Sequence, residues 1–288
     1  MNDTICLVTG ANAGIGLETA RALAVRGATV VMSGRDAAKL ECAVGEISRD
    51  APPGRVEALV CDLASLRSVR EAAEQFRARY ARLDLLVNNA GLFLSDRRLT
   101  EDGFESTIGI NHLGHFLLTH LLRDRIFASS GARVVNVASN AHRAAKQLDT
   151  DDLHAERRPY SGVRAYAESK LANVLYTREL ARRWSNRGIR VNAVHPGVVN
   201  TRISADGDAR GLVRWLWDLG RPFMLTPADG TKTTVHVATS DEGGSVSGRY
   251  FAKSAQVKPS RQALDDALAA RLWDASERAV GVPGSHAG

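Results

Sequence analysis

Short apolar runs alternate with longer amphipathic stretches over the first 195 residues of the chain. Each run is almost continuously apolar and is bounded by turn residues, which is typical of strands covered on both faces. The stretches between the runs carry apolar residues at helical spacing and predict helices, as do residues 260–280. We expect strands at residues 4–8, 28–32, 56–60, 83–87, 133–138 and 189–194, followed by a last strand at 248–251.

Six alternations of strand and helix predict an α/β fold, namely a doubly wound, Rossmann-type parallel sheet with helices on both faces, in three α/β/α layers. The crossovers between its parallel strands should be right-handed. With 288 residues, of which 44% are apolar, the chain can bury a sizeable core. No repeat or low-complexity linker interrupts it, so we expect a single domain over residues 1–288.

An aromatic segment follows the sixth expected strand. Residues 200–226 include Trp215, Trp217 and Phe223. A segment of this kind, placed after the last turn at the edge of the sheet, is suited to form a lid over an apolar substrate. A packed core helix and a contact between subunits are the alternatives. We therefore expect residues 200–226 to be a substrate lid.

The first expected strand leads into a glycine-rich turn and then into a helical pattern. This order suits a phosphate-binding loop, because a helix N-terminus attracts an anion. Gly10 permits the tight turn, Gly14 lets the backbone approach a pyrophosphate, and Gly16 lets helix and strand pack closely. The spacing is G-x-x-x-G-x-G, which differs from the G-x-G-x-x-G fingerprint. We predict nucleotide binding at Gly10, Asn12, Gly14, Ile15 and Gly16.

The end of the second strand bears on the choice of cofactor. NAD-specific sites place a carboxylate there for the ribose 2′-hydroxyl, but Gly34 and Arg35 stand at this point of the chain. A guanidinium suits a 2′-phosphate, which it can bind through two hydrogen bonds. Asp36 is the competing residue, because it suits either the ribose or the N-cap of the next helix. We expect NADP(H) as the cofactor in preference to NAD(H).

Turn residues after the other strands are further candidates for cofactor contact. Asp62 and Leu63 follow the third strand, where Asp62 either contacts the adenine ring or caps the next helix. Small residues after strands four and six let backbone lie against a cofactor, and an ordinary turn is the alternative. These small residues are Asn89, Ala90, Gly91, Pro196 and Gly197.

Tyr166 and Lys170 lie four residues apart in a stretch with helical spacing, so their side chains should share one face. A cation beside a phenol favours phenolate and should lower the tyrosine pKa from its usual value near 10. Such a tyrosine can exchange a proton with a carbonyl or alcohol oxygen. Ser139 ends the fifth strand, at the edge where ligands bind. Asn111 is predicted to lie in the middle of a helix. Asparagine is locally unfavourable there, so we expect it to have a specific role.

Charge and composition exclude several classes of protein. The net charge of +6 comes from scattered basic residues without an aromatic-interleaved stripe, so we expect no nucleic-acid partner. His112 and His115 lack a third ligand at suitable spacing, so we expect no metal. We find no apolar run of membrane-spanning length and no signal peptide, and therefore expect no integral membrane protein. Three separated cysteines indicate reduced thiols and a cytoplasmic location.

Six features, in order along the chain, resemble the motifs of the short-chain dehydrogenase/reductase family. They are TGANAGIG, NNAG, Asn111, Ser139, YAESK and PGVVNT, and the resemblance covers residues 3–255. The retinol-dehydrogenase-like branch is the most similar. The branch resemblance rests on residues 102–105, 111–122, 169–180 and 193–199, and on the long insertion between Ser139 and Tyr166.

The resemblance implies a role for each candidate catalytic residue. Tyr166 would be the general acid and base. Lys170 would lower the pKa of Tyr166 and bind the nicotinamide ribose. Ser139 would hold the substrate oxygen, and Asn111 would support a water that relays protons to Lys170.

The implied activity is hydride transfer between NADP(H) and a carbonyl or alcohol substrate, which we expect to be bulky and apolar. The backbone of Val199 and the side chain of Thr201 would hold the nicotinamide carboxamide. A homodimer or homotetramer is expected from the family. Because the first predicted strand starts at residue 4, we expect no N-terminal anchor of the kind found in the membrane-bound retinol dehydrogenases. The alternative is a non-catalytic redox sensor or regulator, which would keep the glycine-rich turn without needing the catalytic residues.

Overall fold

The computed structural model describes residues 1–51, 55–197 and 225–282. These residues form one eight-stranded sheet of order β3-β2-β1-β4-β5-β6-β7-β8. Neighbouring strands from β3 to β7 pair in parallel, and β8 pairs antiparallel with β7. The strands are β1 (Ile5–Thr9), β2 (Thr29–Gly34), β3 (Val56–Val60), β4 (Leu85–Asn88), β5 (Arg133–Val137), β6 (Arg190–His195), β7 (Tyr250–Ala252) and β8 (Ala255–Gln256).

Helices follow most of the strands, as the alternating pattern predicts. They are α1 (Gly14–Val25), α2 (Ala37–Ser48), α3 (Leu66–Arg79), α4 (Ser106–Ile108), α5 (Gly114–Leu121), α6 (Arg123–Phe127), α7 (Gly162–Arg183), α9 (Pro227–Thr239), α10 (Asp241–Ser245) and α11 (Asp266–Val280). Within the described ranges, none of them is long and apolar enough to cross a membrane.

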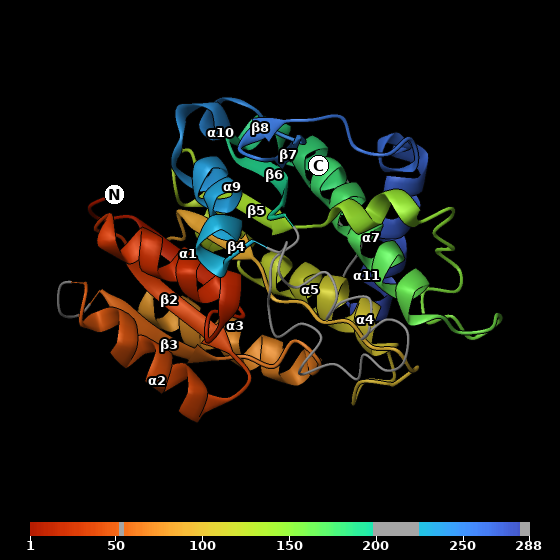
Figure 1. Cartoon of the computed structure of the whole chain (residues 1–288), viewed down its shortest axis with the longest axis horizontal. Coiled ribbons are helices and arrows are strands. Elements are labelled where there is room, and N and C mark those ends of the chain that lie inside the picture. Colours follow the sequence, from red (N-terminus) through yellow and green to blue (C-terminus); the bar gives the residue numbers. More distant parts are fainter. Residues whose placement is uncertain (52–54, 198–224, 283–288) are drawn as a thin grey trace.

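Neighbouring residues of the central strands face opposite helical layers, because successive side chains of a strand point to opposite sides. Leu7 of β1 belongs to the core formed with α3, α5 and α7, which includes Phe76 and Phe116. Cys6 and Val8 belong to the opposite core, formed with α1, α2 and α9. Figure 1 shows α9 beside α1, although the two helices are far apart in the sequence. The predicted three-layer, Rossmann-type fold is confirmed.

The last helix, α11, covers the outer side of α7 (Figure 1). It begins after Asp265, whose side chain accepts a hydrogen bond from Leu268 N, so it starts six residues later than the sequence predicted. Trp273 of α11 packs its ring 4.9 Å from that of Phe116, and the Arg183 guanidinium lies 4.3 Å from the Trp273 ring. The C-terminal helix is thereby anchored to the helices that carry the candidate site.

The predicted lid falls almost entirely outside the described residues, because residues 198–224 are not described. Trp215, Trp217, Val199 and Thr201 are among these, so the predictions for them stay predictions. Of the expected lid, the structure describes residues 225 and 226. Thr226 is the N-cap of α9, where its side chain accepts a hydrogen bond from Asp229 N at 3.1 Å.

Candidate active site

The predicted site residues that the structure describes gather at one edge of the sheet. The glycine-rich turn follows β1, Arg35 follows β2, Asp62 follows β3, Ser139 follows β5 and Pro196 follows β6. The carboxyl ends of parallel strands meet at the same edge, and ligands bind where the strand order reverses. In this sheet the order reverses at β1, which lies between β2 and β4. The edge at β1 and β4 is therefore the expected cofactor crevice.

The glycine-rich turn has the geometry of an anion cradle. Gly10 and Gly14 have positive φ values of 63° and 58°, which favour glycine. A Cβ at Gly16 would lie 2.2 Å from the Gly10 carbonyl oxygen, so only glycine fits there. The N-cap of α1 is Ala13, and no side chain occupies its first turn as a cap. The free N–H groups of that turn suit a pyrophosphate.

Arg35 and Asp36, the two candidates for ribose contact after β2, have different environments. Asp36 is the N-cap of α2, where it accepts a hydrogen bond from Lys39 N at 3.1 Å. That hydrogen bond, and then the charge of the Lys39 side chain, hold the pKa of Asp36 below its usual value. Arg35 is exposed. Gly34 lies under the side chain of Asn12, whose Oδ1 would be 3.1 Å from a Cβ at that position.

Asp62 does not cap α3, which was one of the two roles that the sequence left open, but it holds the turn before that helix. Its Oδ1 accepts a hydrogen bond from Ala64 N at 2.9 Å, which closes the turn before α3. The N-cap of α3 is Ser65, so Asp62 is not itself the cap. Leu63 is buried, and its carbonyl oxygen would lie 2.6 Å from a Cβ at Gly114. The turn after β3 is thus packed closely against the start of α5.

Helix α7 places Tyr166 and Lys170 on one face, as predicted. Lys170 is 3% exposed, and its Nζ lies 5.6 Å from the centre of the Tyr166 ring. The same Nζ donates a hydrogen bond to the Val137 carbonyl at 3.2 Å. The Ser139 side chain is near enough to the Tyr166 hydroxyl to act on its pKa. Three predicted catalytic residues are therefore brought together from β5 and α7.

The direction of the tyrosine shift differs from the sequence prediction. Burial raises the pKa of Tyr166 to about 12, and the hydrogen bond to Ser139 opposes this shift only in part. Burial lowers the pKa of Lys170 to about 8. The expected reduction of the tyrosine pKa considered only the neighbouring cation. Desolvation of the phenolate is the dominant effect on this pKa, and the Ser139 side chain is the group that opposes it.

Asn111 lies in a π-helical turn, Gly109–Leu113, between α4 and α5. Such turns are rare and are frequent at functional sites. Its side chain binds both backbone groups of Leu92, accepting from the N–H at 2.8 Å and donating to the carbonyl at 3.0 Å. A Cβ at Gly91 would lie 3.2 Å from both Asn111 Oδ1 and Lys170 Nζ. Asn111 therefore fixes the segment after β4 next to the lysine.

His112 and His115 engage different parts of the molecule. The His112 Nε2 lies 2.8 Å from Ser276 Oγ of α11, and the His115 Nε2 lies 2.8 Å from Thr9 Oγ1 of β1. The two rings therefore do not converge on one point as a ligand pair would. Among the described residues, no group of three or more His, Cys, Asp or Glu side chains could hold a metal ion.

The loop that carries Ser139 is fixed by residues that the sequence analysis missed. The fully buried His142 lies with Nδ1 2.6 Å from the Ser139 carbonyl and accepts a hydrogen bond from Ser260 N at 3.0 Å. Asn140 N donates to His195 Nδ1 at 3.4 Å, and Tyr250 donates to Asn140 Oδ1 at 3.0 Å. Most of these contacts join positions far apart in the sequence, so no local pattern could predict them. His195 therefore has a structural role in this loop.

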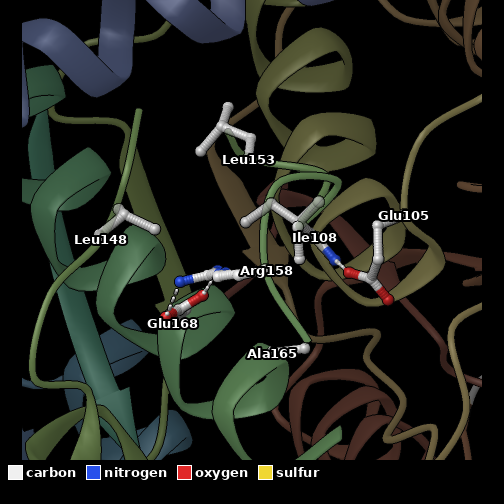
Figure 2. Close-up of a pocket in the computed structure, with 8 residues that line it drawn as sticks. Glu105, Ile108, Leu148, Leu153, Arg158, Ala165 and Glu168 are labelled. Atoms are coloured by element: carbon white, nitrogen blue, oxygen red, sulfur yellow. Dashed lines mark hydrogen bonds and ion pairs between the residues drawn. The ribbon is translucent and has the colours of Figure 1, made fainter. Parts of the chain in front are cut away.

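The insertion between Ser139 and Tyr166 is packed against α7. Asp152 is buried and accepts backbone hydrogen bonds from Glu156 and Arg157. Figure 2 shows Arg158 of the insertion directed at Glu168 of α7. The cavity beside this ion pair has a volume of about 10 Å³, enough for one water but not for a substrate. The insertion therefore supports the catalytic helix.

Comparisons with known proteins agree with this geometry. The family model described as enoyl-(acyl carrier protein) reductase matches residues 10–251. Human retinol dehydrogenase 12 is 44% identical over 278 residues, which cover 96% of this chain and 86% of that protein. A solved structure from Mycobacterium paratuberculosis has a TM-score of 0.79 and 36% identity, and the match covers 98% of this chain and 94% of that one.

A blue fluorescent protein from a metagenomic library, solved in complex with NADPH, is also similar. It has a TM-score of 0.68 and 31% identity, with 88% of this chain and 96% of that chain covered. The chain belongs to the short-chain dehydrogenase/reductase family, and its retinol-dehydrogenase-like character is confirmed. It is an oxidoreductase with a nicotinamide dinucleotide as its cofactor.

The depressed pKa of Lys170 predicts how stability depends on pH. Because the folded pKa is about 8 and the unfolded one 10.5, the unfolded state binds more protons between these values. The free energy of unfolding should therefore rise with pH in this window, by about 3 kcal/mol. Urea denaturation from pH 7.5 to 10.5, compared with Lys170→Met, isolates this contribution from other titrating groups. A difference between the two proteins that stays constant with pH would contradict the buried cation.

Proposed function

We propose that the protein transfers a hydride between NADP(H) and a bulky, apolar ketone or secondary alcohol, using Tyr166 as the acid or base. The observation that carries this proposal is the convergence of Ser139, Tyr166 and Lys170 at the edge of the sheet. The Ser139 side chain opposes the rise of the Tyr166 pKa, and the Lys170 ammonium lies 5.6 Å from the centre of the tyrosine ring. A protein that only sensed a dinucleotide would not need this arrangement.

Each residue has a separate task in the proposed reaction. Tyr166 gives its hydroxyl proton to a carbonyl oxygen, or takes one from an alcohol in the reverse direction. Ser139 orients that oxygen through its hydroxyl. The positive charge of Lys170 stabilises the phenolate that remains after proton transfer. Asn111 supports the backbone at Leu92 and a water that relays protons to Lys170. The bound nicotinamide supplies or accepts the hydride.

The residues present fit a phosphorylated dinucleotide. The uncapped first turn of α1 and the close approach at Gly16 suit a pyrophosphate. A Cβ at Gly91 would crowd Lys170 Nζ at 3.2 Å, so glycine at this position keeps the ammonium accessible to a ribose hydroxyl. Arg35 is exposed after β2 and available for a 2′-phosphate, while Asp36 is engaged as a helix cap. These features support NADP(H) in preference to NAD(H).

Apolar groups near Tyr166 support a bulky, apolar substrate. The ring of Phe93 is half-buried and meets the Tyr166 ring edge-on, with the ring centres 5.8 Å apart. The half-exposed side chain of Leu225 lies over Gly197, at the end of β6. The Phe93 ring can pack against a substrate whose carbonyl approaches Tyr166. We also propose a cytoplasmic location, which the three free cysteines support.

Replacing Tyr166 by Phe tests the proposed mechanism. The substitution keeps the ring and removes the exchangeable proton, so kcat should fall by about a hundredfold or more. NADPH affinity should change little. The measurement is NADPH consumption at 340 nm with a panel of ketones, and Tyr80→Phe, at the C-cap of α3, is the matched control. A Tyr166→Phe enzyme that turns over like the parent would exclude this residue as the acid.

The second prediction concerns cofactor choice. Arg35→Ala should weaken NADPH binding by roughly ten- to a hundredfold, because a charge-assisted contact is worth about 1.5–3 kcal/mol. NADH affinity should stay the same, since NADH carries no 2′-phosphate. Fluorescence titration of both cofactors measures the effect. Lys39→Ala is the control, because it removes a nearby exposed cation that pairs with Asp36.

Two outcomes would count against this assignment. Equal weakening by Arg35→Ala and Lys39→Ala would indicate general electrostatic attraction instead of a contact at Arg35. Equal affinity of the parent for NADPH and NADH would remove the preference itself. Gly34→Asp is a poorer probe, because its Cβ would crowd the Asn12 side chain and change the turn as well as the charge.

The third prediction tests the nature of the substrate. Phe93→Ala should raise KM for a bulky aromatic ketone by about tenfold, because a lost aromatic contact is worth about 1.4 kcal/mol. KM for a short aliphatic ketone should change less than twofold, by our own rough allowance for a side chain that such a substrate does not reach. Phe93→Leu should give an intermediate value for the bulky ketone. Equal changes for both ketones would show that Phe93 supports Tyr166 without contacting substrate.

A further inference from the structure

His115 occupies a buried position between two parts of the candidate site. It lies on α5, is 3% exposed, and follows Asn111 by four residues. Its Nε2 is 2.8 Å from Thr9 Oγ1 at the end of β1, and its Nδ1 is 3.3 Å from the Asn111 carbonyl oxygen. The imidazole therefore touches both the strand that leads into the glycine-rich turn and the π-helical turn of Asn111.

The hydrogen bonds around Thr9 determine where the imidazole proton lies. The backbone N–H groups of Asn89 and Ala90 donate to Thr9 Oγ1 at 2.9 and 3.0 Å, which uses both of its lone pairs. The hydroxyl proton then needs an acceptor. His115 Nε2 at 2.8 Å is closer than the Val87 carbonyl oxygen at 3.4 Å. Nε2 is therefore unprotonated, and the ring proton lies on Nδ1, facing the Asn111 carbonyl oxygen.

Burial keeps this imidazole neutral. Desolvation lowers the pKa of His115 to about 3, and the nearby charge of Lys170 acts in the same direction. A neutral ring offers one donor and one acceptor. The two neighbours require one of each, because Thr9 donates a proton and the Asn111 carbonyl accepts one. Both ring nitrogens of His115 are thus matched to their partners.

We infer that His115 is a positioning residue that couples the Asn89–Gly91 turn, where the cofactor would lie, to the Asn111 turn beside Lys170. Thr9 Oγ1 accepts hydrogen bonds from the backbone of this segment at Asn89 and Ala90, and Asn111 Oδ1 accepts one at Leu92. His115 contacts both Thr9 and Asn111. Gly91, between these anchor points, borders Lys170 Nζ and Asn111 Oδ1. The inference rests on the proposed function, because it assigns this turn to cofactor binding.

A double-mutant cycle tests the coupling. His115→Phe keeps an aromatic ring but removes both hydrogen bonds, and Thr9→Val removes the hydroxyl with little change in shape. His115→Phe should weaken NADPH binding by roughly tenfold, the scale of one buried group left without its partner. Thr9→Val should weaken it more, because it also leaves the N–H groups of Asn89 and Ala90 without an acceptor. The double variant should bind NADPH about as weakly as Thr9→Val alone, because Thr9→Val already breaks the hydrogen bond to His115. NADPH affinity is measured by fluorescence titration, and kcat by ketone reduction.

His112→Phe is the matched control. His112 is also a buried imidazole near Asn111, but it bonds to Ser276 of α11 instead of Thr9. Its substitution should lower the melting temperature while changing the Kd of NADPH by less than about twofold, within ordinary measurement scatter. A tenfold loss of NADPH affinity in His112→Phe would mean that any disturbance of this helix weakens the site. That result would overturn the specific role of His115.

His115→Gln keeps the test decisive if the Phe variant does not fold. Its amide oxygen can accept from Thr9, but its single side chain cannot also donate to the Asn111 carbonyl. NADPH affinity should stay within about threefold of the parent while kcat falls by about tenfold, a separation that general instability would not produce. Parent-like kcat in His115→Gln, or fully multiplicative losses in the cycle, would overturn the inference. Lack of NADPH binding by the parent would instead contradict the proposed function.

Discussion

The buried ammonium group of Lys170 is the constraint on which the candidate site depends. An ion removed from water is costly unless polar groups surround it. The Val137 carbonyl accepts hydrogen bonds from Lys170 Nζ and from Asn173 Nδ2, each at 3.2 Å. Below it, Asn88 of β4 and Asn136 of β5 lie in register and are bonded at 2.8 Å. Asn136 also donates to Thr177 Oγ1 of α7 at 2.9 Å, so these buried amides connect both strands to the helix that carries Lys170.

The same burial acts on Tyr166 in the opposite direction. It raises the pKa of the phenol to about 12 and lowers that of the lysine to about 8. At neutral pH the site therefore holds a neutral phenol beside an ammonium. The phenol is in the form that can donate a proton, and the ammonium is placed to stabilise the phenolate that would result. Burial alone would oppose proton transfer, so the cation and the Ser139 hydrogen bond must offset it.

Local patterns in the sequence predicted most of the fold. The strands could be located because each is a short apolar run, and the glycine-rich turn because its conformation favours glycine. The ends of the strands and helices were predicted less accurately. Strand β4 spans Leu85–Asn88 instead of 83–87, and the last helix starts at Asp266 instead of 260. Hydrophobicity changes gradually at such ends, whereas hydrogen bonds decide where an element stops.

The candidate site was predictable only where family motifs mark it. The tyrosine shift was predicted in the wrong direction, because the sequence shows a neighbouring cation but does not show how deeply the phenol is buried. The π-helical turn at Asn111 had one local sign, an asparagine in a helical stretch. His115 and His142 had none, since their partners Thr9 and Ser260 lie more than a hundred residues away. Contacts of this kind depend on the completed fold.

These distant contacts show how the C-terminal third completes a site whose predicted catalytic residues all precede it. Ser260 N donates to His142, which in turn lies 2.6 Å from the Ser139 carbonyl. Tyr250 holds Asn140, the next residue of the same loop. The strand ends of the sheet bring the catalytic side chains to one edge, but they leave the loops beyond them free to vary. Hydrogen bonds from Tyr250 and Ser260 fix the loop that carries Ser139. The orientation of the serine therefore depends on segments that do not touch the reacting atoms.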